Sequence, residues 1–276
     1  MGVPIDRQVT HLDRYYHFTQ LMRDPTIESH LIRYQSDYDE TVQTVLIMQP
    51  ANRISKNLFF FFHGMDGDSG DAVVVQDVVK RLEATVVAPG GRGASWVSDA
   101  FLADAEQVIG RYSQGFNGYH IMGVSMGGTQ VLALPGLLPA RLRRSILGVI
   151  ALVPGSDLPC IMQNSSNGRV RETLKASVDG STTKLQQRSP IRLIDRYKDN
   201  LPFTIFYNED DTILLTRELE TFFFVLRHAD HPLALFSTPG DHEFTYKHFD
   251  YVKLAQGLGN NLVRKGGAPL WRQEDG

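Results

Sequence analysis

The sequence predicts an α/β protein with a mostly parallel central sheet, helices on both faces and antiparallel strands at its N-terminal side. Strand-sized apolar runs alternate with helix-sized segments along most of the 276 residues. Residues 58–62 are continuously apolar, which is typical of a central strand that is covered on both faces. The length, with 42% hydrophobic and 21% charged residues, fits a single domain over residues 1–276.

The elements follow in chain order from residue 29, and the segment before residue 28 has no clear pattern. A hairpin is expected first, because two β-rich runs flank the turn-like residues 36–39. Apolar residues at helical spacing mark the helix at 99–112, and Pro135 is expected to end the helix that starts at Met126. The expected strands are 30–34, 41–48, 58–62, 85–88, 119–124, 146–152, 203–207 and 233–237. The expected helices are 71–83, 99–112, 126–134, 216–226 and 244–262, and the tail from Arg264 is expected to fray.

Composition excludes several classes of protein. The net charge of −3, without a block of five like charges, argues against a nucleic-acid binder. The longest apolar runs are strand-sized, so no membrane span is expected, and the N-terminus lacks the apolar run of a secretory signal. We therefore expect a cytoplasmic protein. The single cysteine, Cys160, can form neither an internal disulfide nor a multi-cysteine zinc site.

The strongest chemical signal is Gly123-Val124-Ser125-Met126-Gly127, which fits the pattern G-x-S-x-G between an expected strand and an expected helix. This pattern places a serine on a sharp strand-to-helix turn, where its hydroxyl projects. Side chains at positions 123 and 127 would collide with the turn, so glycine is needed there. The amides at the start of the following helix favour developing negative charge. Ser125 is therefore the candidate nucleophile.

A serine needs a base, and the base needs an acid that orients it. His242 is the candidate base, because it follows a late strand after a glycine-containing turn. Three adjacent acidic residues, 209–211, follow the strand before it. Asp211 is favoured as the acid because an apolar pair follows that could fold the loop back under the sheet, and Asp210 remains the alternative.

An oxyanion hole needs two backbone N–H groups. One is expected from Met126, directly after the serine. The other is expected from Met65, because Gly64 lets the loop after strand 58–62 turn toward the serine. The acidic residues Asp66, Asp68 and Asp71 do not have the spacing of an EF-hand, so no metal site and no cofactor is expected.

These features resemble the α/β-hydrolase superfamily over about residues 29–262. The residues that carry the likeness are His63-Gly64, Gly123 to Gly128, Asp211 and Gly240-Asp241-His242. Within the superfamily, the Ser-Met-Gly-Gly turn and the loop Pro89-Gly90-Gly91-Arg92-Gly93-Ala94-Ser95-Trp96, with the acidic Asp99 after it, resemble the esterase D and antigen-85-like branch. That resemblance implies the α/β-hydrolase fold and places Gly64 and Trp96 near the substrate.

Residues 154–189 depart from this branch and read as a lid-like insertion. The segment has no strand pattern and is rich in serine, glycine, asparagine and threonine, which favours a mobile lid over a rigid cap. It leaves the sheet at the edge where Ser125 lies, so we expect it to cover the serine. Ile161 and Met162, with Leu158, are expected to offer an apolar wall to an acyl group. A surface loop without a part in binding is the alternative.

The sequence therefore predicts a serine hydrolase that cleaves a small-molecule ester or thioester through an acyl-enzyme. An acyltransferase or a peptidase with the same residues is an alternative. A non-catalytic binding protein is another, since fold alone does not determine function. The sequence does not indicate the acyl group, the leaving group or the oligomeric state.

Overall fold

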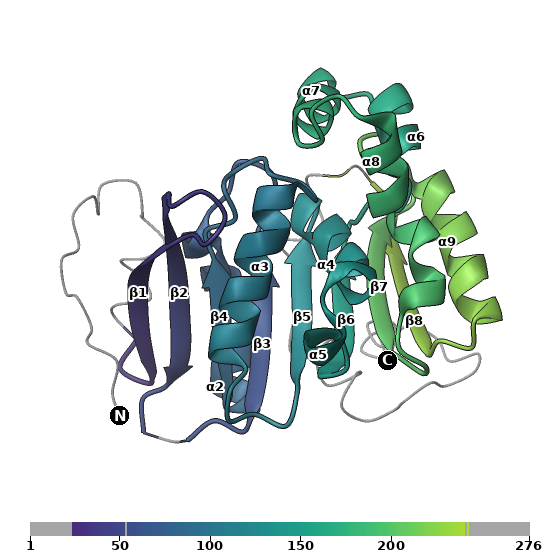
Figure 1. Cartoon of the computed structure of the whole chain (residues 1–276). Coiled ribbons are helices and arrows are strands. Elements are labelled where there is room, and N and C mark those ends of the chain that lie inside the picture. Colours follow the sequence, from purple (N-terminus) through teal and green to yellow (C-terminus); the bar gives the residue numbers. More distant parts are fainter. Residues whose placement is uncertain (1–23, 53, 241, 243–276) are drawn as a thin grey trace.

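The computed structural model describes residues 24–52, 54–240 and 242, and its strands form one eight-stranded sheet in the order β1-β2-β4-β3-β5-β6-β7-β8 (Figure 1). β2 runs antiparallel to both of its neighbours, and all other neighbouring pairs are parallel. The predicted fold class is therefore confirmed. The strands are β1 (Ile27–Gln35), β2 (Val42–Pro50), β3 (Asn57–Phe62), β4 (Ala84–Pro89), β5 (Tyr119–Val124), β6 (Ile146–Leu152), β7 (Phe203–Asn208) and β8 (Leu233–Thr238).

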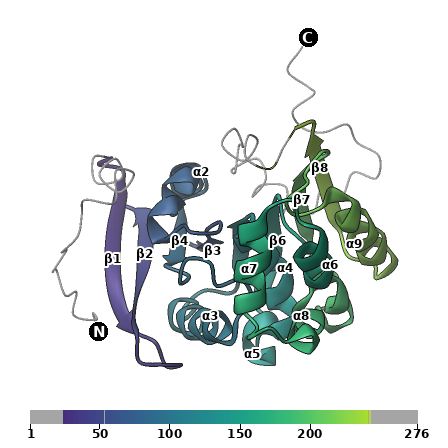
Figure 2. The ribbon, with the colours of Figure 1, turned by 90° about the horizontal axis from the view of Figure 1, so that it is seen from above.

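The apolar run in β3 supplies both faces of the sheet, because successive side chains of a strand point to opposite sides. Leu58, Phe60 and Phe62 belong to one buried cluster. Phe59 and Phe61 belong to the other. The first cluster packs under α3 (Asp99–Tyr112), α4 (Met126–Leu137) and α9 (Thr216–His228), and the second packs under α2 (Gln76–Leu82). Figure 2 shows α2 on one side of the sheet and α3 on the other.

Two helices differ in type or length from the helices predicted at 71–83 and 126–134. The helix expected at 71–83 is a 3-10 helix over Ser69–Val75 followed by α2. Asp68 caps its start by accepting a 2.7 Å hydrogen bond from the Gly70 amide, and the following β-branched valines disfavour the α conformation. α4 continues through Pro135 to Leu137, so the prediction that Pro135 ends the helix is wrong. Pro135 lies in the last turn, so the bond that its missing N–H would make is lost only two residues before the helix ends at Leu137.

Regular helices fill the insertion at 154–189, so the prediction of a loop-like segment there is wrong. They are α6 (Leu158–Asn164), α7 (Gly168–Ala176) and α8 (Thr182–Arg188), and they lie above the end of the sheet where β6 stops (Figure 1). Asp157, Asn167 and Ser181 are their N-caps. The polar residues that resemble loop composition thus start helices.

The helix expected at 244–262, the segment before residue 24 and the tail from Arg264 lie outside the described residues. Three short helices complete the described part of the chain: α5 (Ala140–Arg143) and the 3-10 helices Pro190–Arg192 and Ile194–Arg196. Within the described ranges, no helix combines the length and the apolar character needed to cross a bilayer.

Candidate active site

Ser125 occupies a strained turn between β5 and α4. Its φ of 56° and ψ of −116° lie in a region that L-residues rarely adopt. A Cβ atom on Gly123 would lie 2.2 Å from the carbonyl oxygen of Gly127, and one on Gly127 would lie 2.1 Å from that of Phe62. Backbone contacts therefore exclude side chains at both positions.

Ser125, His242 and Asp211 form one hydrogen-bonded series. The Oγ atom of Ser125 lies 2.8 Å from Nε2 of His242, and Nδ1 of His242 lies 2.6 Å from Oδ2 of Asp211. An ionised carboxylate only accepts hydrogen bonds, so Nδ1 donates to Asp211 and Nε2 is left to accept from the serine hydroxyl. Ser125 follows β5, Asp211 follows β7 and His242 follows β8. The structure thus brings together residues that come after the carboxyl ends of three strands.

The carboxylate of Asp211 is held in place by backbone amides. Its Oδ1 atom accepts hydrogen bonds from the amides of Ile213 at 2.8 Å and Leu214 at 2.9 Å, which leaves Oδ2 for His242. The side chain of Asp211 is 4% exposed. Asp210, the alternative, accepts a 3.3 Å bond from the Gly240 amide at the exposed rim. Asp211 is therefore the acid that contacts His242.

Of the two residues expected to supply oxyanion amides, Met126 directly follows Ser125 and Met65 lies in the loop after β3. Met126 is the first residue of α4, whose N-terminus has no side-chain cap. Met65 lies in a turn closed by a 3.1 Å bond from the Gly67 amide to the Gly64 carbonyl. A Cβ on Gly64 would be 3.7 Å from Cβ of Ser125, so this loop lies against the serine.

The residues expected to contact substrate are more buried than expected. Trp96 is 1% exposed, and its indole N–H donates a 2.9 Å hydrogen bond to Oγ1 of Thr173 in α7. Ile161 is 0% exposed and packs into the core under the insertion, so it offers no accessible wall to an acyl group in this structure. Met162 is partly buried against the same core.

Three residues of the insertion join the site, and no sequence motif marks them. The Ser166 amide donates a 3.0 Å bond to the carbonyl of Thr212, next to Asp211. On the opposite side, Arg169 pairs with Asp66 at 2.7 Å. Oγ1 of Thr173 lies 3.4 Å from Sδ of Met65. The insertion thus contacts both the loop of the acid and the loop of the expected oxyanion amide.

The acidic residues of the loop after β3 have partners other than a metal. Asp68 caps the 3-10 helix, and Asp66 pairs with Arg169. In the part of the chain that the structure describes, no three His, Cys, Asp or Glu side chains gather in a way that could hold a metal ion.

No family model and no curated protein matches the sequence. Solved structures do match. An acylaminoacyl peptidase from Pyrococcus horikoshii aligns with a TM-score of 0.69 and 12% identity over 92% of this chain and 45% of that chain. An S-formylglutathione hydrolase from Staphylococcus aureus aligns with a TM-score of 0.63 and 13% identity over 84% of this chain and 98% of that chain.

A bacterial brefeldin A esterase, described as a homologue of human hormone-sensitive lipase, aligns with a TM-score of 0.64 and 19% identity over 92% of this chain and 78% of that chain. These neighbours share one architecture. The chain has the α/β-hydrolase fold. It spans less than half of the acylaminoacyl peptidase, so the likeness to that protein covers one part of it only.

Proposed function

We propose that this α/β-hydrolase-fold chain is a serine hydrolase that cleaves a carboxylic ester or thioester of a small molecule. The observation that carries the proposal is the hydrogen-bonded series from Ser125 Oγ through His242 to Asp211, with the serine on a strained turn. The solved neighbours that are an esterase and an S-formylglutathione hydrolase favour ester and thioester substrates.

In this mechanism Ser125 Oγ attacks the substrate carbonyl carbon, and its proton passes to Nε2 of His242. Asp211 orients the imidazole and stabilises its cationic form. The carbonyl oxygen becomes an oxyanion, which the amides of Met65 and Met126 bind. The carbon–oxygen or carbon–sulfur bond then breaks, and His242 returns the proton to the leaving alcohol or thiol. Water, activated by His242, releases the acid from Ser125.

The fluorophosphonate reaction tests the nucleophile, because such probes phosphonylate activated serines. We expect one label per chain in the wild type and none in Ser125→Ala. Undiminished labelling of Ser125→Ala would show that another residue is the nucleophile.

A hydrolysis panel tests the substrate class. It compares acyl chain lengths, aryl esters, acyl thioesters and acyl-peptide anilides, each with Ser125→Ala as the control. Turnover of esters or thioesters above the anilides supports the proposal, whereas preferred cleavage of anilides favours the peptidase. Transfer to an added alcohol faster than hydrolysis favours the acyltransferase. If the wild type is neither labelled nor active on any substrate, the binding-protein alternative stands.

A further inference from the structure

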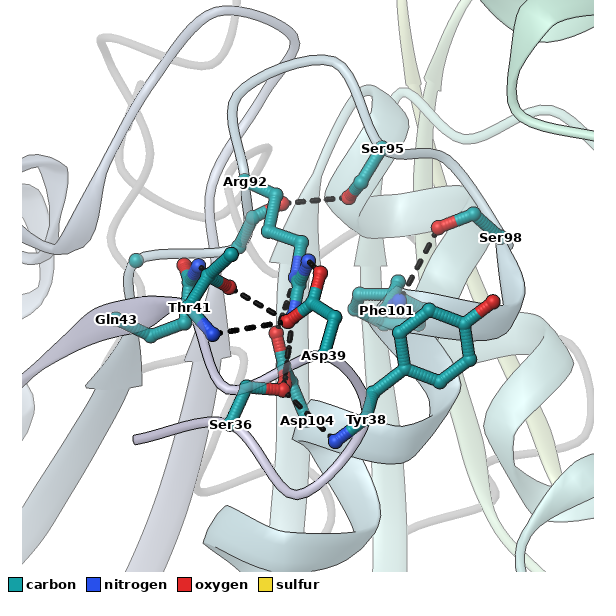
Figure 3. A network of polar contacts seen from close by, with 12 residues as sticks. Ser36, Tyr38, Asp39, Thr41, Gln43, Arg92, Ser95, Ser98, Phe101 and Asp104 are labelled. Carbon is teal, nitrogen blue, oxygen red and sulfur yellow. Dashed lines mark hydrogen bonds and ion pairs between the residues drawn. The ribbon is translucent and has the colours of Figure 1, made fainter. Parts of the chain in front are cut away.

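Arg92, outside the proposed catalytic series, lies between the carboxylates of Asp39 and Asp104, which are 53 and 12 residues away in the sequence (Figure 3). Its Nη1 and Nη2 atoms donate to both carboxylate oxygens of Asp39 at 2.6 and 2.9 Å. Its Nε atom donates to Oδ2 of Asp104 at 2.6 Å, and Nη2 also reaches Oγ of Ser36 at 2.8 Å. Asp104 is 4% exposed and Ser36 is 1% exposed. The guanidinium therefore ties the β1–β2 turn and α3 to the loop after β4.

The backbone of this loop is strained at Arg92. Gly91, Arg92 and Gly93 follow one another with φ values of 63°, 59° and 65°. Glycine adopts this left-handed region readily, but arginine does so only at a cost in free energy. Such a conformation persists where the surroundings hold it, and strain of this kind concentrates at functional sites. Here the hydrogen bonds of the Arg92 guanidinium to Asp39 and Asp104 hold the backbone of Arg92 in the left-handed conformation.

The other side of the same loop contacts both segments that carry the proposed oxyanion amides. The Gly90 carbonyl lies 2.8 Å from Nε2 of His63, whose Nδ1 lies 2.6 Å from the Gly64 carbonyl, directly before Met65. The Trp96 amide donates a 3.2 Å bond to Sδ of Met126. The loop thus contacts Met126 directly and contacts the segment before Met65 through His63.

We propose that Arg92 is a positioning residue for the oxyanion hole of the reaction proposed above, on which this inference rests. Its two ion pairs hold the loop 90–96, with the left-handed turn at 91–93, in the path that sets His63 and Met126 in place. Oxyanion stabilisation depends on donors fixed before the reaction, and small displacements weaken it strongly. Arg92 bonds to Ser36, Asp39 and Asp104, so its proposed part in the reaction is indirect.

The two glycines beside Arg92 provide a matched pair for the test. A Cβ on Gly91 would lie 2.3 Å from Nε2 of His63, whereas a Cβ on Gly93 meets no described atom within 4 Å. Alanine at either position must adopt a left-handed φ, which is 63° at Gly91 and 65° at Gly93. Gly93→Ala therefore measures the effect of backbone strain in the loop, and Gly91→Ala adds the displacement of His63.

The experiment measures kcat, KM, the rate of fluorophosphonate labelling and Tm for wild type, Arg92→Met, Arg92→Lys, Gly91→Ala and Gly93→Ala. For Arg92→Met we expect kcat and the labelling rate to fall about 10–100-fold with KM within about 3-fold, because oxyanion donors act mainly in the transition state. Arg92→Lys restores part of the rate, since an ammonium can still pair with one carboxylate. Gly91→Ala loses about 10-fold more kcat than Gly93→Ala.

Two controls separate positioning from general stability. Arg141→Lys alters the exposed ion pair with Glu106 on α3 and should leave kcat unchanged. Val108→Ala removes buried volume from α3 without removing either ion pair of Arg92, so it should lower Tm but leave kcat within about 2-fold. If Arg92→Met does not fold, the kcat values of Arg92→Lys, Gly91→Ala and Gly93→Ala test the inference.

The inference is overturned if the Arg92 variants lower Tm alone and keep kcat within about 2-fold. Equal losses of kcat in Gly91→Ala and Gly93→Ala would also overturn it, because His63 would then not transmit the effect. An inactive, unlabelled wild type would overturn the proposed function and this inference together. An active wild type with insensitive Arg92 variants would overturn this inference alone.

Discussion

Asp211 and His242 contact each other through a 2.6 Å hydrogen bond between Oδ2 and Nδ1, while Oδ1 of Asp211 is occupied by two backbone amides. The carboxylate thus has a fixed orientation before any substrate binds. Asp211→Asn would place an amide against His242, which removes the anion and favours the wrong tautomer. We expect kcat to fall about 10³-fold or more, measured with the best ester of the panel.

Asp210→Asn is the matched control for this change. Asp210 accepts a bond from the Gly240 amide at the rim, and an asparagine oxygen can accept the same bond. Its kcat should therefore stay within about 10-fold of the wild type. A larger loss of kcat in Asp210→Asn than in Asp211→Asn would mean that Asp210 is the acid. The rest of the proposed mechanism would be unchanged.

The strain at Ser125 predicts an order of stabilities. Ser125→Ala and Ser125→Gly both lose the hydroxyl that contacts His242, so they differ mainly in backbone freedom. At a φ of 56° and ψ of −116°, alanine retains the strain and glycine relieves it. We expect Ser125→Gly to be more stable than Ser125→Ala by about 1 kcal/mol in thermal unfolding. Equal Tm values would mean that the turn is not strained in solution.

Much of the fold could be predicted because strand periodicity and turn residues are local signals. Parallel strands place their carboxyl ends at one edge, so the loops after β5, β7 and β8 could be expected to meet. That reasoning selects Ser125, Asp211 and His242, which the structure brings within hydrogen-bond distance. The apolar pair after Asp211 favours it over Asp210 in the sequence, but the contact with His242 depends on the path of one loop.

The remaining parts depend on contacts between distant residues. The insertion helices are 7–9 residues long, so their apolar periodicity is short, and their capping residues resemble a loop. Trp96 was expected near the substrate, but it is buried and bonded to Thr173. Arg92 pairs with Asp39, 53 residues away, and no local pattern indicates such a pair.

The partly buried His120 predicts a loss of stability in mild acid. Its ring stacks on Phe59 with centroids 4.8 Å apart, and burial lowers the pKa of His120 from 6.5 to about 4. The depressed pKa means that the folded state disfavours the charged form. Stability is therefore complete above pH 6.5 and is lost as the pH falls toward 4. From this group alone we expect a loss of about 2 kcal/mol between pH 7 and 5.

Urea unfolding at pH 7 and pH 5 measures this loss, with His120→Phe as the comparison. Phenylalanine keeps an aromatic ring beside Phe59 but cannot take up a proton. The variant should lose about 2 kcal/mol less than the wild type over the same interval, whatever its stability at pH 7. If the two proteins lose the same free energy, His120 is not the group that titrates.

The insertion is expected to act on substrate binding through Met162 and on stability through Ile161. Ile161 is fully buried, and a Cβ on Gly155 would lie 2.3 Å from its Cδ1 atom, so the packing there is tight. Ile161→Ala should lower stability by about 2–4 kcal/mol in urea unfolding, with no preference for one acyl length. Met162 is only partly buried, so it retains surface that an acyl group can contact.

For Met162→Ser we expect a higher KM for long-chain esters than for short ones, because a longer chain buries more apolar surface against this position. Met162→Leu keeps the apolar volume and serves as the control, so its KM values should follow the wild type. Fluorophosphonate labelling of Ser125 should persist in both variants, since neither changes the proposed nucleophile or its partners. Unchanged KM values across all ester lengths in Met162→Ser would mean that this position of the insertion has no part in substrate binding.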